Sequence, residues 1–281
     1  MGLTVGVTGA SGYVGSALST ALQDAGHTIV PMGRNAVPDG RAFMLGEVPN
    51  KETLTGLDVL IHCAWDMRAS KAALVDEINV HGSINLFTAA ANAGVNTLIF
   101  VSSMSAFAGC RSLYGRAKLE VEDRVAQLGG IIIRPGLVYG PTPGGMVGAL
   151  TQLSNHTHVL PMVGTGRFKL HTSHQDDLGR LTVYACENSE AYRGSTISAA
   201  AHTGLEFRAI VRRLSRNNLH FIPVPWQLIY AGLRILESLH MRPRIKSDSL
   251  LGLVHSNPAP DFKTLDTTGI EFRLLEKHTS N

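Results

Sequence analysis

The sequence predicts an α/β fold, a Rossmann-type doubly wound parallel sheet with a smaller C-terminal substrate-binding lobe. Short apolar runs over 3–7, 28–32, 59–62, 97–101 and 131–133 are typical of buried strands. Helical patterns over 12–25, 76–93 and 114–128 lie between these runs and give the βαβ alternation of a parallel sheet. A glycine-rich turn joins the first strand to the first helix, as in dinucleotide-binding domains.

The first strand leads into the sequence TGASGYVG at 8–15. Glycines at Gly9, Gly12 and Gly15 allow a tight turn, a close backbone approach to a pyrophosphate, and close packing of the helix on the strand. The helix N-terminus then presents free N–H groups to the phosphates. We expect this turn, including Ser11, Tyr13 and Val14, to bind a dinucleotide.

The end of the second strand predicts which dinucleotide is bound. An NAD enzyme usually places an acidic residue there to hold the ribose 2′-hydroxyl. This chain has Arg34 and Asn35 instead. A guanidinium can pair with a 2′-phosphate, so NADP is favoured over NAD, with a solvated loop arginine as the alternative.

A tyrosine and a lysine four residues apart follow the serine-rich end of the 97–101 strand. Tyr114 and Lys118 would share one helix face, and a positive neighbour is expected to lower the pKa of the phenol. The phenol could then exchange a proton with a substrate oxygen that Ser103 holds. A tyrosine and lysine at this spacing also occur as an ordinary helix-surface pair.

The strand–helix alternation weakens after Pro135, where a loop-rich stretch begins. We therefore expect a dinucleotide-binding Rossmann domain over 1–135 and mainly a substrate-binding lobe over 136–281. A short segment near 196–198 is a candidate strand that returns to the main sheet.

Composition limits the class of protein. The 281 residues carry 25 basic and 22 acidic side chains, a balance that indicates neither a nucleic-acid binder nor a membrane-surface protein. Three widely spaced cysteines predict no disulfide framework, and no apolar stretch is long enough to cross a bilayer. The sequence begins without a secretory signal pattern, so a cytoplasmic location is expected. His171 and His174 lack further ligands nearby in the sequence, so no metal site is predicted.

Several motifs follow one another in a characteristic order. They are the glycine turn, DVLIHCA at 58–64, NVHGS at 79–83, the serine pair at 102–103, Tyr114 with Lys118, and RPGLVYG at 134–140. In this order the chain resembles the extended short-chain dehydrogenase/reductases, especially the NAD-dependent epimerase/dehydratase family, over most of its length.

The resemblance implies roles for particular residues. Ser103, Tyr114 and Lys118 match the catalytic positions, and Asn79 matches the asparagine that supports a proton-relay water. Ala64, Pro135 and Val138 match cofactor-contacting positions, and Tyr114 and Lys118 also contact the cofactor. Ser105 is the alternative hydroxyl for the substrate oxygen, and the loop residues Arg167 and His171 are further substrate candidates.

The resemblance implies hydride transfer at a secondary alcohol or ketone carbon of a small molecule. Arg34 and the absence of an asparagine after Arg134 favour net NADPH-linked reduction over nucleotide-sugar epimerisation with transient oxidation. Met104 and Ser105 stand where 4,6-dehydratases have an Asp-Glu pair, so elimination of water is not expected. A non-catalytic dinucleotide sensor stays open as the alternative to an enzyme. Whether the chain forms a homodimer also stays open.

Overall fold

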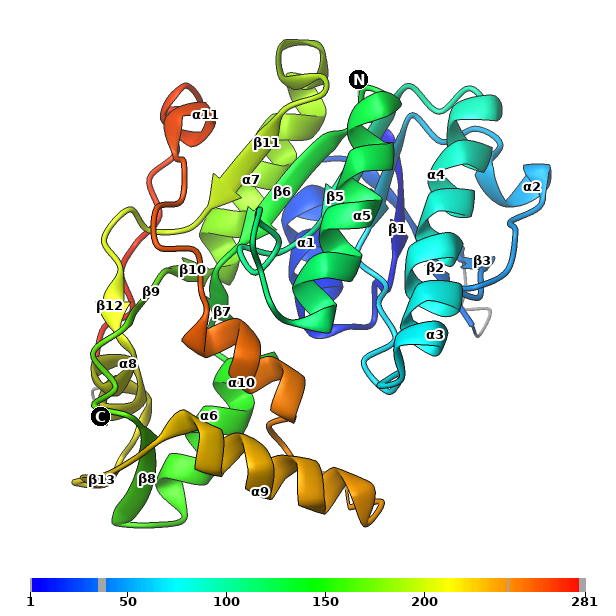
Figure 1. Cartoon of the computed structure of the whole chain (residues 1–281). Coiled ribbons are helices and arrows are strands. Elements are labelled where there is room, and N and C mark those ends of the chain that lie inside the picture. The colour runs from blue at the N-terminus through cyan, green and yellow to red at the C-terminus, as the bar shows by residue number, and fades with distance from the viewer. Residues whose placement is uncertain (1, 35–38, 242, 278–281) are drawn as a thin grey trace.

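A seven-stranded parallel sheet lies at the centre of the molecule (Figure 1). The computed structural model describes residues 2–34, 39–241 and 243–277. The strand order is β11-β6-β5-β4-β1-β2-β3, and every neighbouring pair is parallel. The strands are β1 (Thr4–Thr8), β2 (Thr28–Gly33), β3 (Arg41–Ala42), β4 (Val59–His62), β5 (Thr97–Val101), β6 (Ile131–Pro135) and β11 (Thr196–Ala199).

The strand side chains are apolar on both faces of this sheet, and helices cover both faces. On one face, α1 (Tyr13–Asp24) packs beside α7 (Gln175–Glu187). On the other lie α2 (Lys51–Leu54), α3 (Ala72–Leu74), the π-helical segment η1 (Val75–His81), α4 (Gly82–Asn92) and α5 (Leu113–Gln127). The predicted Rossmann-type fold is confirmed.

The chain after β6 contributes to two regions. Residues 196–198 lie in β11, which pairs with β6, and α7 packs on α1, so these segments belong to the layers of the main sheet. The remaining segments surround a separate apolar core that includes Leu150, Met162, Ile210 and Leu253.

That second region consists of short strand pairs and helices. Its pairs are β7 (Leu137–Tyr139) with β10 (Thr172–His174), β8 (Val159–Val163) with β13 (His220–Val224), and β9 (Lys169–Leu170) with β12 (Leu205–Glu206). Its helices are α6 (Gly145–Asn155), α8 (Phe207–Leu214), α9 (Trp226–Ser238) and α10 (Ser247–Val254). The 3₁₀ turn η2 (Ser189–Tyr192) and α11 (Lys263–Asp266) lie near β11.

The carboxyl ends of the central strands meet at one edge of the sheet. Thr8 ends β1, His62 ends β4, Val101 ends β5 and Pro135 ends β6. In open parallel sheets this edge is where ligands bind. Among the described residues, no helix has the length and apolar character needed to span a membrane.

Candidate active site

The glycine turn is a tight loop between β1 and α1. Gly9 has a φ of +66°, and the Gly12 N–H donates to its carbonyl oxygen at 2.8 Å. A Cβ at Gly9 would lie 2.9 Å from Ala64 N, and a Cβ at Gly15 would lie 2.2 Å from the Gly9 carbonyl oxygen. Side chains are therefore excluded at both positions, and the open backbone suits a pyrophosphate.

The N-terminus of α1 is also suited to an anion. Gly12 occupies the N-cap, and no side chain among the described residues caps the helix there. The backbone N–H groups of the first turn, at Tyr13 and Val14, therefore remain for a phosphate. Ser11 is exposed on the same turn. The predicted cofactor residues of this segment thus lie together on one loop.

A buried chain of hydrogen bonds joins this turn to the loop after β4. The Thr8 hydroxyl accepts the N–H groups of Cys63 and Ala64, both at 3.2 Å, so it donates its own hydrogen to His62 Nδ1 at 2.6 Å. His62 Nε2–H then donates to Ser83 Oγ at 2.8 Å. Burial, and secondly the charge of Lys118, lower the pKa of His62 to about 3. The neutral imidazole therefore connects β4 to both the glycine turn and α4 (Gly82–Asn92).

Asn79 has a structural position beneath the loop after β4. Its side chain is fully buried, its amide oxygen accepts the Asp66 N–H at 2.7 Å, and its amide nitrogen donates to the Asp66 carbonyl oxygen at 3.2 Å. Both polar ends of Asn79 therefore hold this loop. The proton-relay role of Asn79 stays a prediction.

Arg34 lies exposed just after β2, at the edge where an adenosine ribose is expected. The hydrogen bond from Arg68 is the main cause that lowers the pKa of Asp66, and the positive charge of Arg34 lowers it further. Arg34 and Arg68 thus both act on the Asp66 carboxylate. The neighbouring candidate Asn35 lies outside the described residues.

Ser103 and Tyr114 come together because α5 approaches the loop after β5 very closely. A Cβ at Gly115 would lie 2.2 Å from the Ser105 carbonyl oxygen, so only glycine permits this approach. Ser103 Oγ accepts the Ser105 N–H at 3.1 Å and interacts with the Tyr114 phenol. The structure therefore brings two of the predicted catalytic side chains into contact.

Lys118 is held at the end of β5 and over an aromatic ring. Its ammonium donates to the Val101 carbonyl oxygen at 2.9 Å and lies 4.0 Å from the centre of the Trp65 ring and 5.9 Å from that of Tyr114. Burial lowers the pKa of Lys118 to about 7. Burial also raises the pKa of Tyr114 to about 12, against the opposing effect of Ser103. Burial thus sets the direction of the Tyr114 pKa in this structure, and the expected lowering by Lys118 stays a prediction.

A second buried polar group fixes α5 against the sheet. The Ser102 hydroxyl donates to the buried Glu122 carboxylate, which also pairs with Arg134 of β6. This ion pair holds α5, and with it Tyr114, in register with the ends of β5 and β6.

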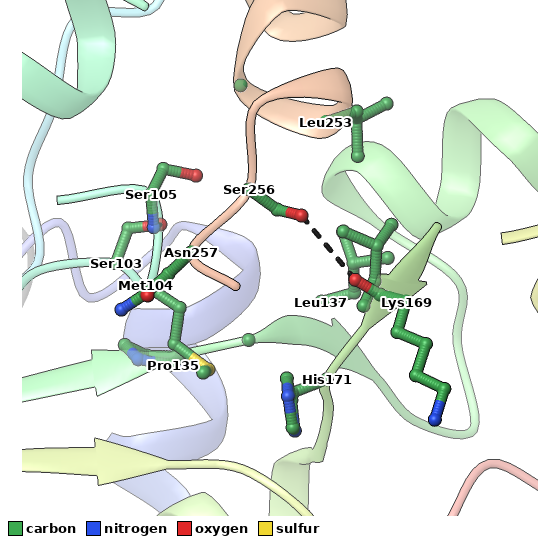
Figure 2. A pocket seen from close by; sticks show the side chains of 13 residues that line it. Ser103, Met104, Ser105, Pro135, Leu137, Lys169, His171, Leu253, Ser256 and Asn257 are labelled. Atoms are coloured by element: carbon green, nitrogen blue, oxygen red, sulfur yellow. Dashed lines mark hydrogen bonds between the residues drawn. The ribbon is translucent and has the colours of Figure 1, made fainter. Parts of the chain in front are cut away.

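A pocket of about 90 Å³ opens beside Ser103. Figure 2 shows Ser103 and Ser105 on one side of it, His171 on another and Leu253 of α10 above. His171 Nδ1–H donates to the Ala201 carbonyl oxygen at 2.8 Å, which leaves Nε2 as an acceptor when the ring is neutral. The structure thus gathers Ser103, Ser105 and His171 around one pocket.

Of the two cofactor candidates after β5, one lines this pocket and the other packs against a core. Pro135 lines it, and its carbonyl oxygen accepts the Met104 N–H at 2.9 Å. Val138 lies in β7 and packs, like Val14, against the core beneath the sheet.

Arg167 is not brought to this pocket. It lies exposed beside a second hollow of about 330 Å³, together with Arg208 and Arg212 of α8. The glycines at 164 and 166 turn the chain just before Arg167, with φ values of +54° and +64°.

Sequence reasoning missed two parts of the site. Trp65 packs edge-on against Tyr114, with ring centres 5.7 Å apart, and its immediate position after the DVLIHCA motif was the available signal. The pocket wall formed by Gly252, Leu253, Ser256 and Asn257 had no local signal, because it lies about 140 residues away in the chain. In the described part of the chain, no cluster of three or more His, Cys, Asp or Glu side chains is arranged to hold a metal.

Residues 5–200 match the model of the NAD dependent epimerase/dehydratase family. The chain belongs to this family. The resemblance drawn from the motifs is thereby confirmed.

Curated relatives differ in their reactions. An uncharacterised protein of Mycobacterium tuberculosis is 28% identical over 272 residues, which cover 94% of this chain but only 27% of that protein. A UDP-glucose 4-epimerase of Vibrio cholerae is 32% identical over 170 residues, covering 48% of this chain and 52% of its own. A 2-alkyl-3-oxoalkanoate reductase of Stenotrophomonas maltophilia is 24% identical over 207 residues, covering 61% of each chain.

Solved structures share the fold. MoeE5 in complex with UDP-glucose and NAD has a TM-score of 0.71 at 19% identity, with 96% of this chain and 94% of that chain covered. The UDP-N-acetylglucosamine 4-epimerase from Bacillus cereus has a TM-score of 0.64 at 17% identity, with 90% and 98% covered. At these identities the likeness concerns the fold alone.

Proposed function

We propose that this protein is an NADPH-linked reductase that converts a small ketone to a secondary alcohol, and that runs the reverse oxidation under other conditions. The close approach of α5 to the loop after β5, which sets the Tyr114 phenol beside Ser103, carries the proposal. A tyrosine phenol is neutral at physiological pH, since its ordinary pKa is about 10, and so Tyr114 holds a proton to donate. Donation to a carbonyl oxygen is what ketone reduction requires.

The residues of the site take distinct parts in this reaction. Ser103 holds the substrate oxygen, and Tyr114 donates its proton to that oxygen. A bound nicotinamide cofactor would supply the hydride. Lys118, held between Val101 and Trp65, keeps a positive charge or a donor near the cofactor ribose.

The glycine turn supports dinucleotide binding, and Arg34 supports NADPH as the dinucleotide. The Cβ-free surface at Gly9 and Gly15 and the uncapped N-terminus of α1 fit a pyrophosphate. An exposed guanidinium beyond β2 fits a 2′-phosphate better than a bare 2′-hydroxyl. We infer that 1–135 binds the cofactor and that 136–281 mainly shapes the substrate side.

Pocket size supports a small substrate. The pocket beside Ser103 measures about 90 Å³, whereas sites for drug-sized ligands measure roughly 300–1,000 Å³. A short carbonyl compound fits such a space better than a nucleotide sugar. The three cysteines, all unpaired, are compatible with a reducing compartment such as the cytoplasm.

Nucleotide-sugar epimerisation is the second candidate, favoured by the UDP-glucose 4-epimerase relative. It uses the same serine, tyrosine and lysine, but the cofactor ends each turnover unchanged. Dehydration is disfavoured because Met104 and Ser105 supply neither an acid nor a base at the pocket.

One experiment separates these functions. The purified protein is incubated with NADPH and a short 2-alkyl-3-oxoalkanoate, and separately with UDP-glucose and NAD⁺, and products are identified by mass spectrometry. If one molecule of alcohol is formed for each NADPH that is consumed, the proposal is supported. The 4-epimer of UDP-glucose without net cofactor change would instead establish epimerisation. Tight cofactor binding with neither product would favour a dinucleotide sensor.

A further inference from the structure

Helix α10 reaches from the second core to the first turn of α5. The Asp248 carboxylate accepts the backbone N–H of Leu113 at 2.6 Å through Oδ1 and that of Tyr114 at 3.0 Å through Oδ2. In the sequence, Asp248 is 135 residues from Leu113 and 134 from Tyr114. A side chain of the C-terminal part therefore binds the backbone of the proposed proton donor.

This contact completes the N-terminus of α5. The first N–H groups of a helix have no partner within the helix. Ser112 Oγ accepts the Gly115 N–H at 3.0 Å as the N-cap, and Asp248 accepts the two N–H groups before it. A carboxylate at this end also interacts favourably with the helix dipole. The backbone of Tyr114 is thus fixed from both sides.

Helix α10 is itself held at its own N-terminus. The Glu237 carboxylate of α9 accepts the Ser247 N–H and the Ser247 hydroxyl, both at 2.7 Å. Lys246 donates to the carbonyl oxygen of Met67, in the loop after β4. Asp248 is therefore presented by an anchored helix.

The same helix forms a wall of the pocket beside Ser103. Gly252 and Leu253 line that pocket, and a Cβ at Gly252 would lie 3.5 Å from Ser112 Oγ and 3.8 Å from Ser105 Oγ. One face of α10 thus lines the pocket (Figure 2), while its first turn holds the first turn of α5.

We propose that Asp248 is a positioning residue for Tyr114, and that through it α10 couples the substrate pocket to the placement of the phenol against Ser103. This inference rests on the proposed role of Tyr114 as proton donor. It assigns to the C-terminal part a catalytic contribution beyond shaping the pocket.

The test compares Asp248→Ala and Asp248→Asn with the wild type. Asp261→Ala is the matched control, because Asp261 likewise accepts a backbone N–H, from Lys263 at 2.9 Å, at the start of α11. Turnover is measured with NADPH and the 2-alkyl-3-oxoalkanoate, and with NAD⁺ and UDP-glucose. The Tyr114 ring is followed by NMR in protein carrying ¹³C-labelled tyrosine, with Tyr114→Phe identifying its signal among six tyrosines.

The NMR signal reports position because the Tyr114 ring lies edge-on to Trp65 at an interplanar angle of 81°. Asp248→Ala should shift this signal and lower kcat by about 10- to 100-fold, since misplacing a reacting group by about 1 Å costs up to about 10²-fold. The affinity for NADPH should stay within about twofold of wild type, because Asp248 lies outside the glycine turn. Asp248→Asn, whose amide oxygen still accepts one N–H, should lie between, and Asp261→Ala should match the wild type.

An unchanged Tyr114 signal in a folded Asp248→Ala variant would overturn the inference, whether or not any substrate is turned over. A shifted signal with wild-type kcat would also overturn it, because Asp248 would then be a helix cap without catalytic effect. If the wild type turns over neither probe and the signal still shifts in Asp248→Ala, the positioning by Asp248 stands and the proposed reaction fails.

Discussion

The ammonium nitrogen of Lys118 lies 4.0 Å from the centre of the Trp65 ring. An aromatic face attracts a cation, and here it does so in a setting closed to water. The same nitrogen donates to the Val101 carbonyl oxygen. Lys118 is therefore held by a ring after β4 and by the end of β5.

Burial of Lys118 predicts a specific dependence of stability on pH. Its pKa falls from 10.5 to about 7 on folding, so between these values the unfolded chain binds more protons and stability is lost as the pH falls. Lys118→Met should remove this slope, which is at most about 1.4 kcal/mol per pH unit. Urea unfolding at pH values from 7 to 9 measures it. Parallel profiles for Lys118→Met and wild type would contradict the lowered pKa of the buried lysine.

The neutral state of His62 predicts a loss of stability in acid. Folding lowers its pKa from 6.5 to about 3, so the unfolded chain binds the extra proton between these values and the unfolding free energy decreases as the pH falls through them. His62→Gln keeps hydrogen-bonding groups but cannot titrate. Its unfolding free energy should therefore fall less steeply between pH 6.5 and 4 than that of wild type. An equal or steeper fall in the variant would refute the buried neutral imidazole.

The glycine turn and the tyrosine–lysine pair could be predicted from sequence because local spacing determines them. Gly9, Gly12 and Gly15 stand where a turn between a strand and a helix requires them, and Tyr114 with Lys118 follows helical periodicity. The strand pattern likewise predicted the central sheet, since buried parallel strands are nearly continuous apolar runs.

Contacts between distant segments could not be predicted in this way. Spacing places Lys118 on the Tyr114 face, but only the fold brings Val101 and Trp65 into contact with its ammonium. Arg167 lies beside a hollow that it shares with Arg208 and Arg212, about 40 residues further along the chain, and no local pattern predicts this. The contact of Asp248 with α5 depends on how α10 packs, which no local pattern encodes.

Arg34 should determine the choice of cofactor. Arg34→Ala should weaken NADPH binding by about 1.5–3 kcal/mol, the value of a charge-assisted hydrogen bond, and leave NADH binding nearly unchanged. Arg68→Ala is the control, because Arg68 is a nearby exposed arginine already paired with Asp66. Fluorescence titration with both nucleotides measures the effect. Equal losses for NADPH and NADH would show that Arg34 does not read the 2′-phosphate.

The two pocket serines should differ in their contribution. Ser103 interacts with Tyr114, whereas Ser105 Oγ lies toward Gly252 of α10. Ser103→Ala should lower kcat by about 10²-fold, as for loss of one donor to a developing oxyanion. Ser105→Ala should keep most of the turnover and affect KM instead. The reverse order in steady-state kinetics would assign the substrate oxygen to Ser105.

Tyr114→Phe tests the central claim most directly. The substitution keeps the ring that packs on Trp65 and removes the only atom able to donate the proton. Tyr192→Phe is the control, since its hydroxyl contacts Thr267, in the loop after α11. The measurement is turnover with NADPH and the 2-alkyl-3-oxoalkanoate, alongside NADPH affinity. The account predicts that Tyr114→Phe lowers turnover by about 10²–10⁴-fold with NADPH affinity retained, and Tyr192→Phe leaves both unchanged. Full turnover by a folded, cofactor-binding Tyr114→Phe variant would contradict it.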